Sequence, residues 1–218
     1  MFETINKKNL AEICVLLSKS EPRFAKVIAS HGIPPLWNRQ PGFETLLRII
    51  LEQQVSLQSA AAAFNKLQER VHKISPAAVL AISDEELRAC YFSRQKAAYA
   101  KELSTAVIEK RLNLKKLETM SDSDAKTELM KIKGIGNWTS DIYLLMAMLR
   151  TDIMPRGDIA LHQAWADLSA LDARPNADEF QIIAEKWKPF RSVAARILWH
   201  FYLETKASKP KIVNSRHH

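Results

Sequence analysis

The segment KGIGNWTSD, Lys133–Asp141, holds two of the five glycines in this chain of 218 residues. Apolar residues at helical spacing lie before it, in TELMKI, and after it, in DIYLLMAMLR. A chain so poor in glycine uses these residues where its backbone turns sharply, because glycine adopts conformations that other residues avoid. The segment therefore predicts a short joint between two helices, formed around Gly134 and Gly136.

Two phosphate-binding loops with similar glycine spacing do not fit this joint. A dinucleotide-binding fingerprint requires a preceding strand and a third glycine, but the preceding residues are helical in pattern and the third position holds Thr139. A Walker-type loop requires Gly-Lys-Ser/Thr, which does not follow. The joint can also be a simple helix stop, in which Gly134 or Gly136 takes the left-handed conformation that ends the first helix.

A helix–hairpin–helix is the third explanation. In such a turn the backbone N–H groups at the start of the second helix point at an anion, and the helix dipole favours negative charge there. Glycines let a DNA phosphate approach without a Cβ in its way, and Asn137 or Thr139 can add a side-chain donor. Such a contact carries no sequence information. A β-branched residue at Gly136 is then expected to strain the turn and to block the phosphate.

The charge balance indicates an anionic partner or simply a basic surface. Lys and Arg number 32 against 24 Asp and Glu, which gives a net charge of +8 and a pI of about 9.5; nucleic acid is the commonest anionic partner. The two cysteines, Cys14 and Cys90, are too few for a four-thiolate iron–sulfur cluster and indicate no disulfide framework. No apolar run resembles a membrane span or a signal peptide, so we expect an intracellular soluble protein.

Helical periodicity dominates the rest of the chain, and alternating strand-like patterns are scarce. Pattern matching predicts about ten helices, with ends uncertain by a few residues. Several helix ends are marked by residues typical of caps and stops: Pro22, Gly32, Ser56 and the pair Ser83 and Glu86. The Pro-rich segment IPPLWNRQPG, residues 33–42, predicts a boundary between lobes.

A carboxylate follows the second helix of the joint, in TDIMPRGDIALHQAW. Asp158 stands where a helical pattern begins, so it is well placed as an N-cap. A helix N-terminus also keeps a carboxylate ionised through its dipole and amide hydrogen bonds. Such an anion beside a flipped nucleotide could stabilise an oxocarbenium-like sugar and orient a water molecule.

These two features together resemble a known family. MKIKGIGNWTSDIYLLMA followed by DIMPRGDIAL is similar to the helix–hairpin–helix, Gly/Pro-Asp (HhH-GPD) DNA glycosylase superfamily, with Gly136 and Asp158 separated by 22 positions. FETLLRIILEQQVSLQSAAAAFNKL and WKPFRSVAARILWHFYL resemble segments of its 3-methyladenine DNA glycosylase II branch. The resemblance runs from about Phe43 to Leu203.

The resemblance implies an all-α, two-lobed fold with the active-site cleft between the lobes. Residues 1–42 would form the first part of a terminal helical lobe. Residues 43–150 would form a central helical lobe with the helix–hairpin–helix. Residues 151–218 would complete the terminal lobe, with the carboxylate and a basic tail.

The resemblance also assigns roles to single residues. Asp158 matches the catalytic carboxylate, and Trp199 matches an aromatic residue of the base pocket, with Trp138 as core or a pocket wall. Gln54 falls where the family inserts a side chain into the gap left by the flipped nucleotide. The expected DNA-binding hairpin comprises Lys133, Gly134, Gly136, Asn137 and Thr139, although Lys133 replaces a proline that is frequent in the family. No cofactor is expected, but backbone carbonyls in the hairpin can hold a monovalent cation: Met130, Ile132 and Ile135.

The implied activity is that of a monofunctional glycosylase. The chain has no cysteines after Cys90, unlike the iron–sulfur branch, and Trp138 stands where the strand-nicking branch has a lysine. We therefore expect removal of alkylated purines, such as 3-methyladenine and 7-methylguanine, from double-stranded DNA in base excision repair. The protein would act as a monomer, in the bacterial cytoplasm at the nucleoid or in a eukaryotic nucleus. A glycosylase for deaminated or oxidised bases and a non-catalytic DNA-binding module are the alternatives.

Overall fold

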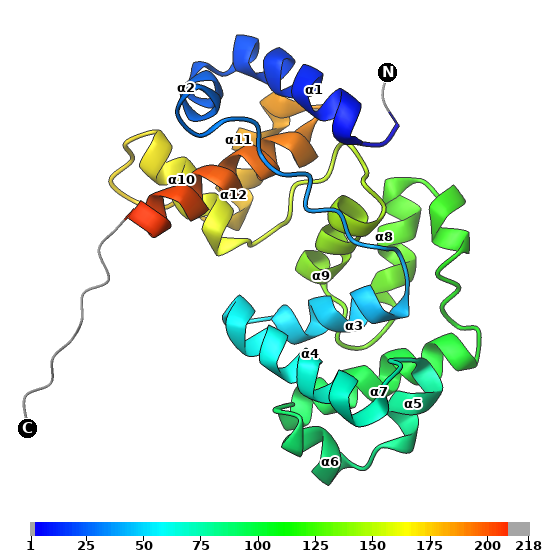
Figure 1. Ribbon diagram of the computed structural model, residues 1–218. Coiled ribbons are helices and arrows are strands. Elements are labelled where there is room, and N and C mark those ends of the chain that lie inside the picture. Colours follow the sequence, from blue (N-terminus) through cyan, green and yellow to red (C-terminus); the bar gives the residue numbers. More distant parts are fainter. Residues whose placement is uncertain (1–2, 209–218) are drawn as a thin grey trace, which may run out of the picture. The chain divides into compact units, whose positions relative to one another are not determined.

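The computed structural model describes residues 3–208, and this part of the chain is built from helices without β-strands (Figure 1). Residues 3–208 contain twelve α-helices. The sequence pattern predicts about ten. One reason for the difference is the short helix α5, Pro76–Ala81, which has too few residues for its apolar stripe to stand out in the sequence. The all-α fold class is confirmed.

The chain divides into two compact units. One contains the residues up to Leu36 and those from Arg156 onward, and the other is Trp37–Pro155. The first boundary lies before the expected division at 42/43, because the backbone of residues 37–42 is bonded to the second unit. The Arg39 N–H donates to the Met146 carbonyl at 2.9 Å, and the Gly42 N–H donates to the Tyr143 hydroxyl at 3.0 Å.

The first unit is arranged around its last helix, α12. Its elements are α1 (Lys7–Ser20), α2 (Pro22–His31), α10 (Ile159–Leu168), α11 (Ala177–Ala184), η3 (Glu185–Trp187) and α12 (Arg191–Ser208). Helix α12 packs against α1, α2 and α10. Buried Arg196 of α12 donates to the Leu36 carbonyl at 2.9 Å, and burial lowers its pKa to about 10. The guanidinium thereby fixes the end of the segment that leaves this unit.

Local signals define the helices of the first unit as expected. Helix α2 has Pro22 in its first turn and ends at Gly32, whose φ of 81° suits glycine. The apolar stripe of α1 is buried, namely Leu10, Ile13 and Leu17.

The second unit is arranged around α3, Phe43–Glu52 (Figure 1). The buried face of this helix comprises Leu46, Leu47, Ile49, Ile50 and Leu51. The other elements are α4 (Leu57–Val71), α5, α6 (Asp84–Ala89), α7 (Arg94–Ile108), η1 (Lys116–Thr119), α8 (Asp122–Met130), α9 (Asn137–Ile142) and η2 (Tyr143–Ala147). Helix α3 contacts α4, α7 and α9. The Ser56 N-cap and the capping box of Ser83 and Glu86 are both present.

The helix after the glycine joint is not a regular α-helix along its whole length. It begins as α9 and continues as the π-helical turn η2. Ile142 and Leu145 are buried, but Trp138 and Leu149 are only half-buried. A π-turn inserts one residue per turn and shifts the helix face, and Leu149 lies beyond the helix with a φ of 54°.

Within residues 3–208, no helix combines the length and the apolar character that crossing a lipid bilayer would require.

Candidate active site

Gly134 is the residue that the fold of the hairpin requires. Helix α8 ends at Met130, and the Ile135 N–H donates to the Ile132 carbonyl at 3.0 Å across the turn. Gly134 has a φ of 96°, and a Cβ added to it would overlap the ring of Tyr99 on α7. Both the backbone conformation and the close approach of Tyr99 exclude a larger residue. Of the two glycines, Gly134 is therefore the left-handed residue of the turn, whereas α8 itself ends earlier, with Lys131 as its right-handed C-cap.

Gly136 has a different environment, and the structure corrects the expectation that a side chain there would strain the turn. Its φ of −101° and ψ of −170° are extended values that any residue adopts. Nothing lies within 4 Å of a Cβ built on it, and the residue is exposed. No contact within residues 3–208 requires a glycine at this position.

The start of α9 is suited to an anion. Gly136 is its N-cap, and among the described residues no side chain caps this helix end. In contrast, α4, α7 and α8 each begin with a serine whose hydroxyl accepts a backbone N–H. Asn137 and Lys133 are exposed beside this helix end. An uncapped helix start with exposed polar and basic residues is a typical phosphate site.

Thr139 does not present its side chain at the surface, which corrects its expected role as a phosphate donor. It is 1% exposed, and its hydroxyl accepts a hydrogen bond from Gln53 Nε2 at 2.7 Å. The same nitrogen donates to the Gly134 carbonyl at 2.8 Å. No local pattern distinguishes Gln53 from its neighbour Gln54, because both are polar residues at the same helix end.

Gln54 lies exposed in the turn between α3 and α4, with a φ of 56°. The turn is held on both sides. Lys96 Nζ donates to the Leu51 carbonyl at 2.5 Å, and Ser56 Oγ accepts the Ser59 N–H at 3.1 Å. Burial lowers the pKa of Lys96. The residue expected to enter DNA is therefore carried by an anchored turn that adjoins the hairpin through Gln53.

The hairpin carbonyls have a donor set that suits a monovalent cation better than a transition metal. Among residues 3–208, no group of three or more His, Cys, Asp or Glu side chains could hold a metal ion. The Ile132 carbonyl accepts one hydrogen bond, from Ile135, and its oxygen has a second lone pair. Neutral carbonyl oxygens are ligands for hard cations.

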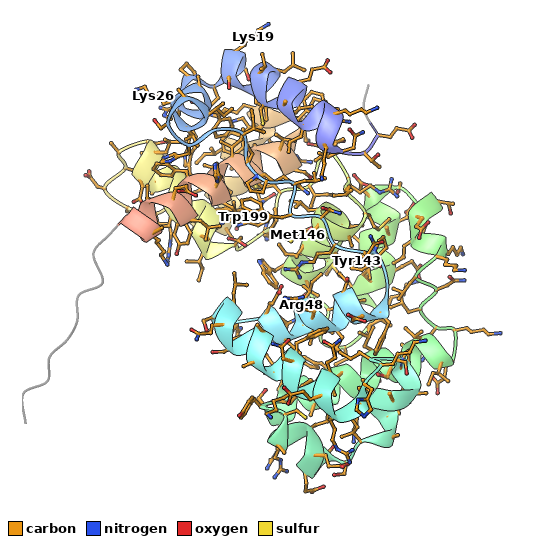
Figure 2. All side chains as sticks on the ribbon, viewed as in Figure 1. Lys19, Lys26, Arg48, Tyr143, Met146 and Trp199 are labelled. Carbon is orange, nitrogen blue, oxygen red and sulfur yellow. The ribbon has the colours of Figure 1, made fainter. Side chains whose placement is uncertain are left out.

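Asp158, in the first unit, is the N-cap of α10. Its Oδ1 accepts the Leu161 N–H at 3.1 Å and the indole N–H of Trp199 at 3.3 Å. Trp199 projects from α12 and is labelled in Figure 2. Asp158 is 9% exposed and Trp199 is 8% exposed. Two donors from two helices thus fix the carboxylate, and the expected pocket residue Trp199 places its polar edge on it.

His162 lies one turn after Asp158 on α10 and was not selected from the sequence. Its Nδ1 lies 3.1 Å from the Pro175 carbonyl, so that nitrogen carries the proton. Burial lowers the pKa of His162, although its hydrogen bond to Pro175 and the charge of Asp158 oppose this. The neutral ring is thereby favoured near neutral pH, and it packs on Phe180 with centroids 4.6 Å apart. These contacts connect the helix that carries Asp158 to α11.

Comparison with known proteins agrees with these features. The Bacillus subtilis protein YfjP is 28% identical over 83% of this chain, which covers 66% of YfjP. Schizosaccharomyces pombe DNA-3-methyladenine glycosylase 1 is 27% identical over 90% of this chain and 92% of its own length. The structure of S. pombe 3-methyladenine DNA glycosylase (Mag1) in complex with abasic DNA matches with a TM-score of 0.76 and 25% identity, over 86% of this chain and 95% of that one.

A family model describes most of the chain as well. Residues 47–190, which include the hairpin and Asp158, match the model of the HhH-GPD superfamily base excision DNA repair protein. The chain belongs to the HhH-GPD superfamily of base excision DNA repair proteins.

Proposed function

We propose that this protein is a monofunctional DNA glycosylase that removes alkylated purines, of the 3-methyladenine and 7-methylguanine type. The observation that carries the proposal is the Asp158 carboxylate, held by the Leu161 and Trp199 N–H groups within the family's hairpin-to-aspartate arrangement. Relatives named for 3-methyladenine support the substrate class. The chain covers 92% of the S. pombe relative but 66% of YfjP. The activity in the names of these relatives is therefore proposed for this chain.

The proposed reaction follows from the charge of the leaving group. The glycosidic C–N bond breaks, and its electron pair leaves with the base, which turns a cationic alkylated purine into a neutral one. The ionised Asp158 stabilises the positive charge that develops on the sugar and orients the attacking water. Water forms the new bond to the sugar carbon, and its proton passes to the carboxylate or to solvent. A leaving group that is already cationic needs no strong general acid.

The hairpin supplies the grip on DNA in this proposal. The uncapped start of α9, with Gly136 and Asn137, would bind a backbone phosphate, and Lys133 would add positive charge. Gln54 would fill the gap that the flipped nucleotide leaves, since flipping costs a few kcal/mol in unstacking. Trp138, half-buried beside the hairpin, would contribute packing.

DNA binding is expected to depend strongly on salt and weakly on sequence. Each neutralised phosphate contributes a slope of about −0.9 in log K against log salt. Binding to undamaged duplexes of different sequence, measured by fluorescence anisotropy from low to moderate salt, checks this. The same titration in potassium and in tetramethylammonium at equal ionic strength tests the cation at the carbonyls of Met130, Ile132 and Ile135, and tighter binding in potassium is expected. A salt-independent binding constant would contradict the phosphate grip.

The product of the reaction is expected to be an intact strand with an abasic site. Trp138 has no amine, so it cannot form the Schiff base that precedes strand cleavage. Denaturing gels should show cleavage only after alkali or heat, and borohydride should trap no covalent protein–DNA adduct. Direct nicking together with a trapped adduct would show that a lysine elsewhere in the chain acts as a nucleophile.

A panel of duplexes, each with one modified base, tests the substrate class. Abasic sites are expected to form most rapidly at 7-methylguanine and more slowly at hypoxanthine. Preferential excision of 8-oxoguanine or uracil would replace the proposal with a glycosylase for oxidised or deaminated bases. No excision of any lesion, with DNA binding intact, would leave the non-catalytic DNA-binding module.

A further inference from the structure

Gln53 forms a bridge across the base of the hairpin. Its side-chain nitrogen donates to the Gly134 carbonyl at 2.8 Å and to the Thr139 hydroxyl at 2.7 Å. A primary amide nitrogen has two N–H groups, so both are used. Gly134 precedes Gly136 and Thr139 follows it, so a single amide holds the two sides of the turn together.

Gln53 also stands at the C-terminal end of helix α3. It is the C-cap of that helix, and its own N–H donates to the Ile50 carbonyl at 3.3 Å. The next residue is Gln54, with a left-handed φ of 56°. A left-handed non-glycine residue persists where its surroundings fix the backbone. The Gln53 amide on one side and the Ser56 cap on the other provide that constraint.

Replacing Gln53 by a residue without a side-chain donor would remove both hydrogen bonds and is expected to destabilise the hairpin. Thr139 is 1% exposed, and Gln53 is half-buried. Removing the amide would leave a buried hydroxyl and a carbonyl without this donor, which is unfavourable because water does not reach a buried group easily. The start of α9 and the end of α3 are therefore connected by these two bonds, although they lie more than eighty positions apart in the sequence, with separations of 81 and 86.

We infer that Gln53 is a positioning residue that couples the exposed turn at Gln54 to the phosphate-binding hairpin. This rests on the proposed function, which gives the turn and the hairpin their contacts with DNA. A phosphate bound at the start of α9 fixes the backbone around Gly134 and Thr139. Through Gln53 the same event fixes the backbone of Gln54 in the conformation that enters the duplex.

Coupling of this kind is reciprocal. If phosphate binding favours insertion of Gln54 by a certain factor, insertion favours phosphate binding by the same factor. Substitutions in the turn at Gln54 and in the hairpin should then have non-additive effects on the free energy of DNA binding, because each substitution already removes part of what the other site contributes. If Gln53 had only a structural role, replacing it would lower the melting temperature, and the effects of changes at Gln54 and at the hairpin on DNA affinity would be additive with Gln53 present.

The test is a double-mutant cycle in two backgrounds. Gly136→Ala alters the hairpin and Gln54→Ala alters the turn, alone and together. Binding is measured to a duplex with a stable abasic-site analogue beside 2-aminopurine, whose fluorescence reports unstacking. With Gln53 present, the combined loss of affinity is expected to differ from the product of the single losses by about fivefold or more. In the Gln53→Met background, which keeps the length but has no donor, the losses should multiply.

Thr139 offers a matched pair that keeps the test open if Gln53→Met does not fold. Thr139→Ser keeps the hydroxyl and should keep the non-additivity, whereas Thr139→Val removes it and should reduce the non-additivity. Losses that multiply in the unmutated background, or non-additivity that survives both Gln53→Met and Thr139→Val, would overturn the inference.

These outcomes are distinct from a failure of the proposed function. The abasic analogue is not cleaved, so the cycle needs no excision. If the unmutated protein excises alkylated bases but shows no coupling, the inference alone is wrong. If it binds no DNA at all, the proposed function is wrong and the inference with it.

Discussion

Replacing Asp158 with Asn is expected to remove excision of weakly activated lesions while the fold and DNA binding remain. The Asn oxygen can still accept the Leu161 and Trp199 N–H groups that Oδ1 accepts now. Asn and Asp are comparable N-caps, so stability should change by less than about 1 kcal/mol. The amide carries no negative charge, and the loss of one electrostatic contact to a transition state typically slows a reaction about 10²–10³-fold.

Single-turnover excision on two lesions makes this test quantitative. Hypoxanthine carries no charge in the glycosidic form, so its excision should fall by the full factor. Excision of 7-methylguanine should fall less, because its own positive charge drives its departure. DNA affinity should hold or rise, since one negative charge near the phosphates is removed. Circular dichroism controls for the fold, and full activity of the Asn variant on hypoxanthine would exclude Asp158 from the mechanism.

Gly134→Ala and Gly136→Ala are expected to separate folding from DNA binding. In Gly134→Ala the new Cβ meets the Tyr99 ring and the residue keeps a φ of 96°. Backbone strain and overpacking each cost about 1–3 kcal/mol, so a loss of about 2 kcal/mol or more is expected. For a chain of this size that lowers the melting temperature by about 4–8 °C.

Gly136→Ala should leave the melting temperature unchanged, because its Cβ would lie in open space. It should weaken binding to damaged and undamaged DNA alike, since the methyl group would occupy the approach of a phosphate. Adding Tyr99→Ala to Gly134→Ala should restore the part of the stability lost to overlap, but not the part due to φ. DNA binding by Gly136→Ala equal to that of the unmutated protein would show that no phosphate approaches this glycine.

Short-range signals made much of the fold predictable. Apolar periodicity gave the all-α class, and cap residues gave helix ends such as those at Pro22, Ser56 and Ser83. Asp158 was expected as an N-cap and is one, because its partner Leu161 lies three residues away. The joint around Gly134 and Gly136 was expected in the same way, but the local pattern left open which of the two glycines is left-handed, and only Gly134 is. Helix α5 was missed because its stripe is too short to produce a period.

The roles within the site depended on contacts that no local pattern contains. Trp199 reaches Asp158 across 41 positions, and Gln53 reaches Gly134 and Thr139 across 81 and 86. The burial of Thr139 and the choice between Gly134 and Gly136 follow from the packing of α3 and α7 against the hairpin. The sequence by itself determined which helices form and where the turn and the carboxylate stand, because those depend on neighbours within one or two turns. The tertiary structure decided which side chains hold the site, because packing brings distant residues within hydrogen-bonding distance.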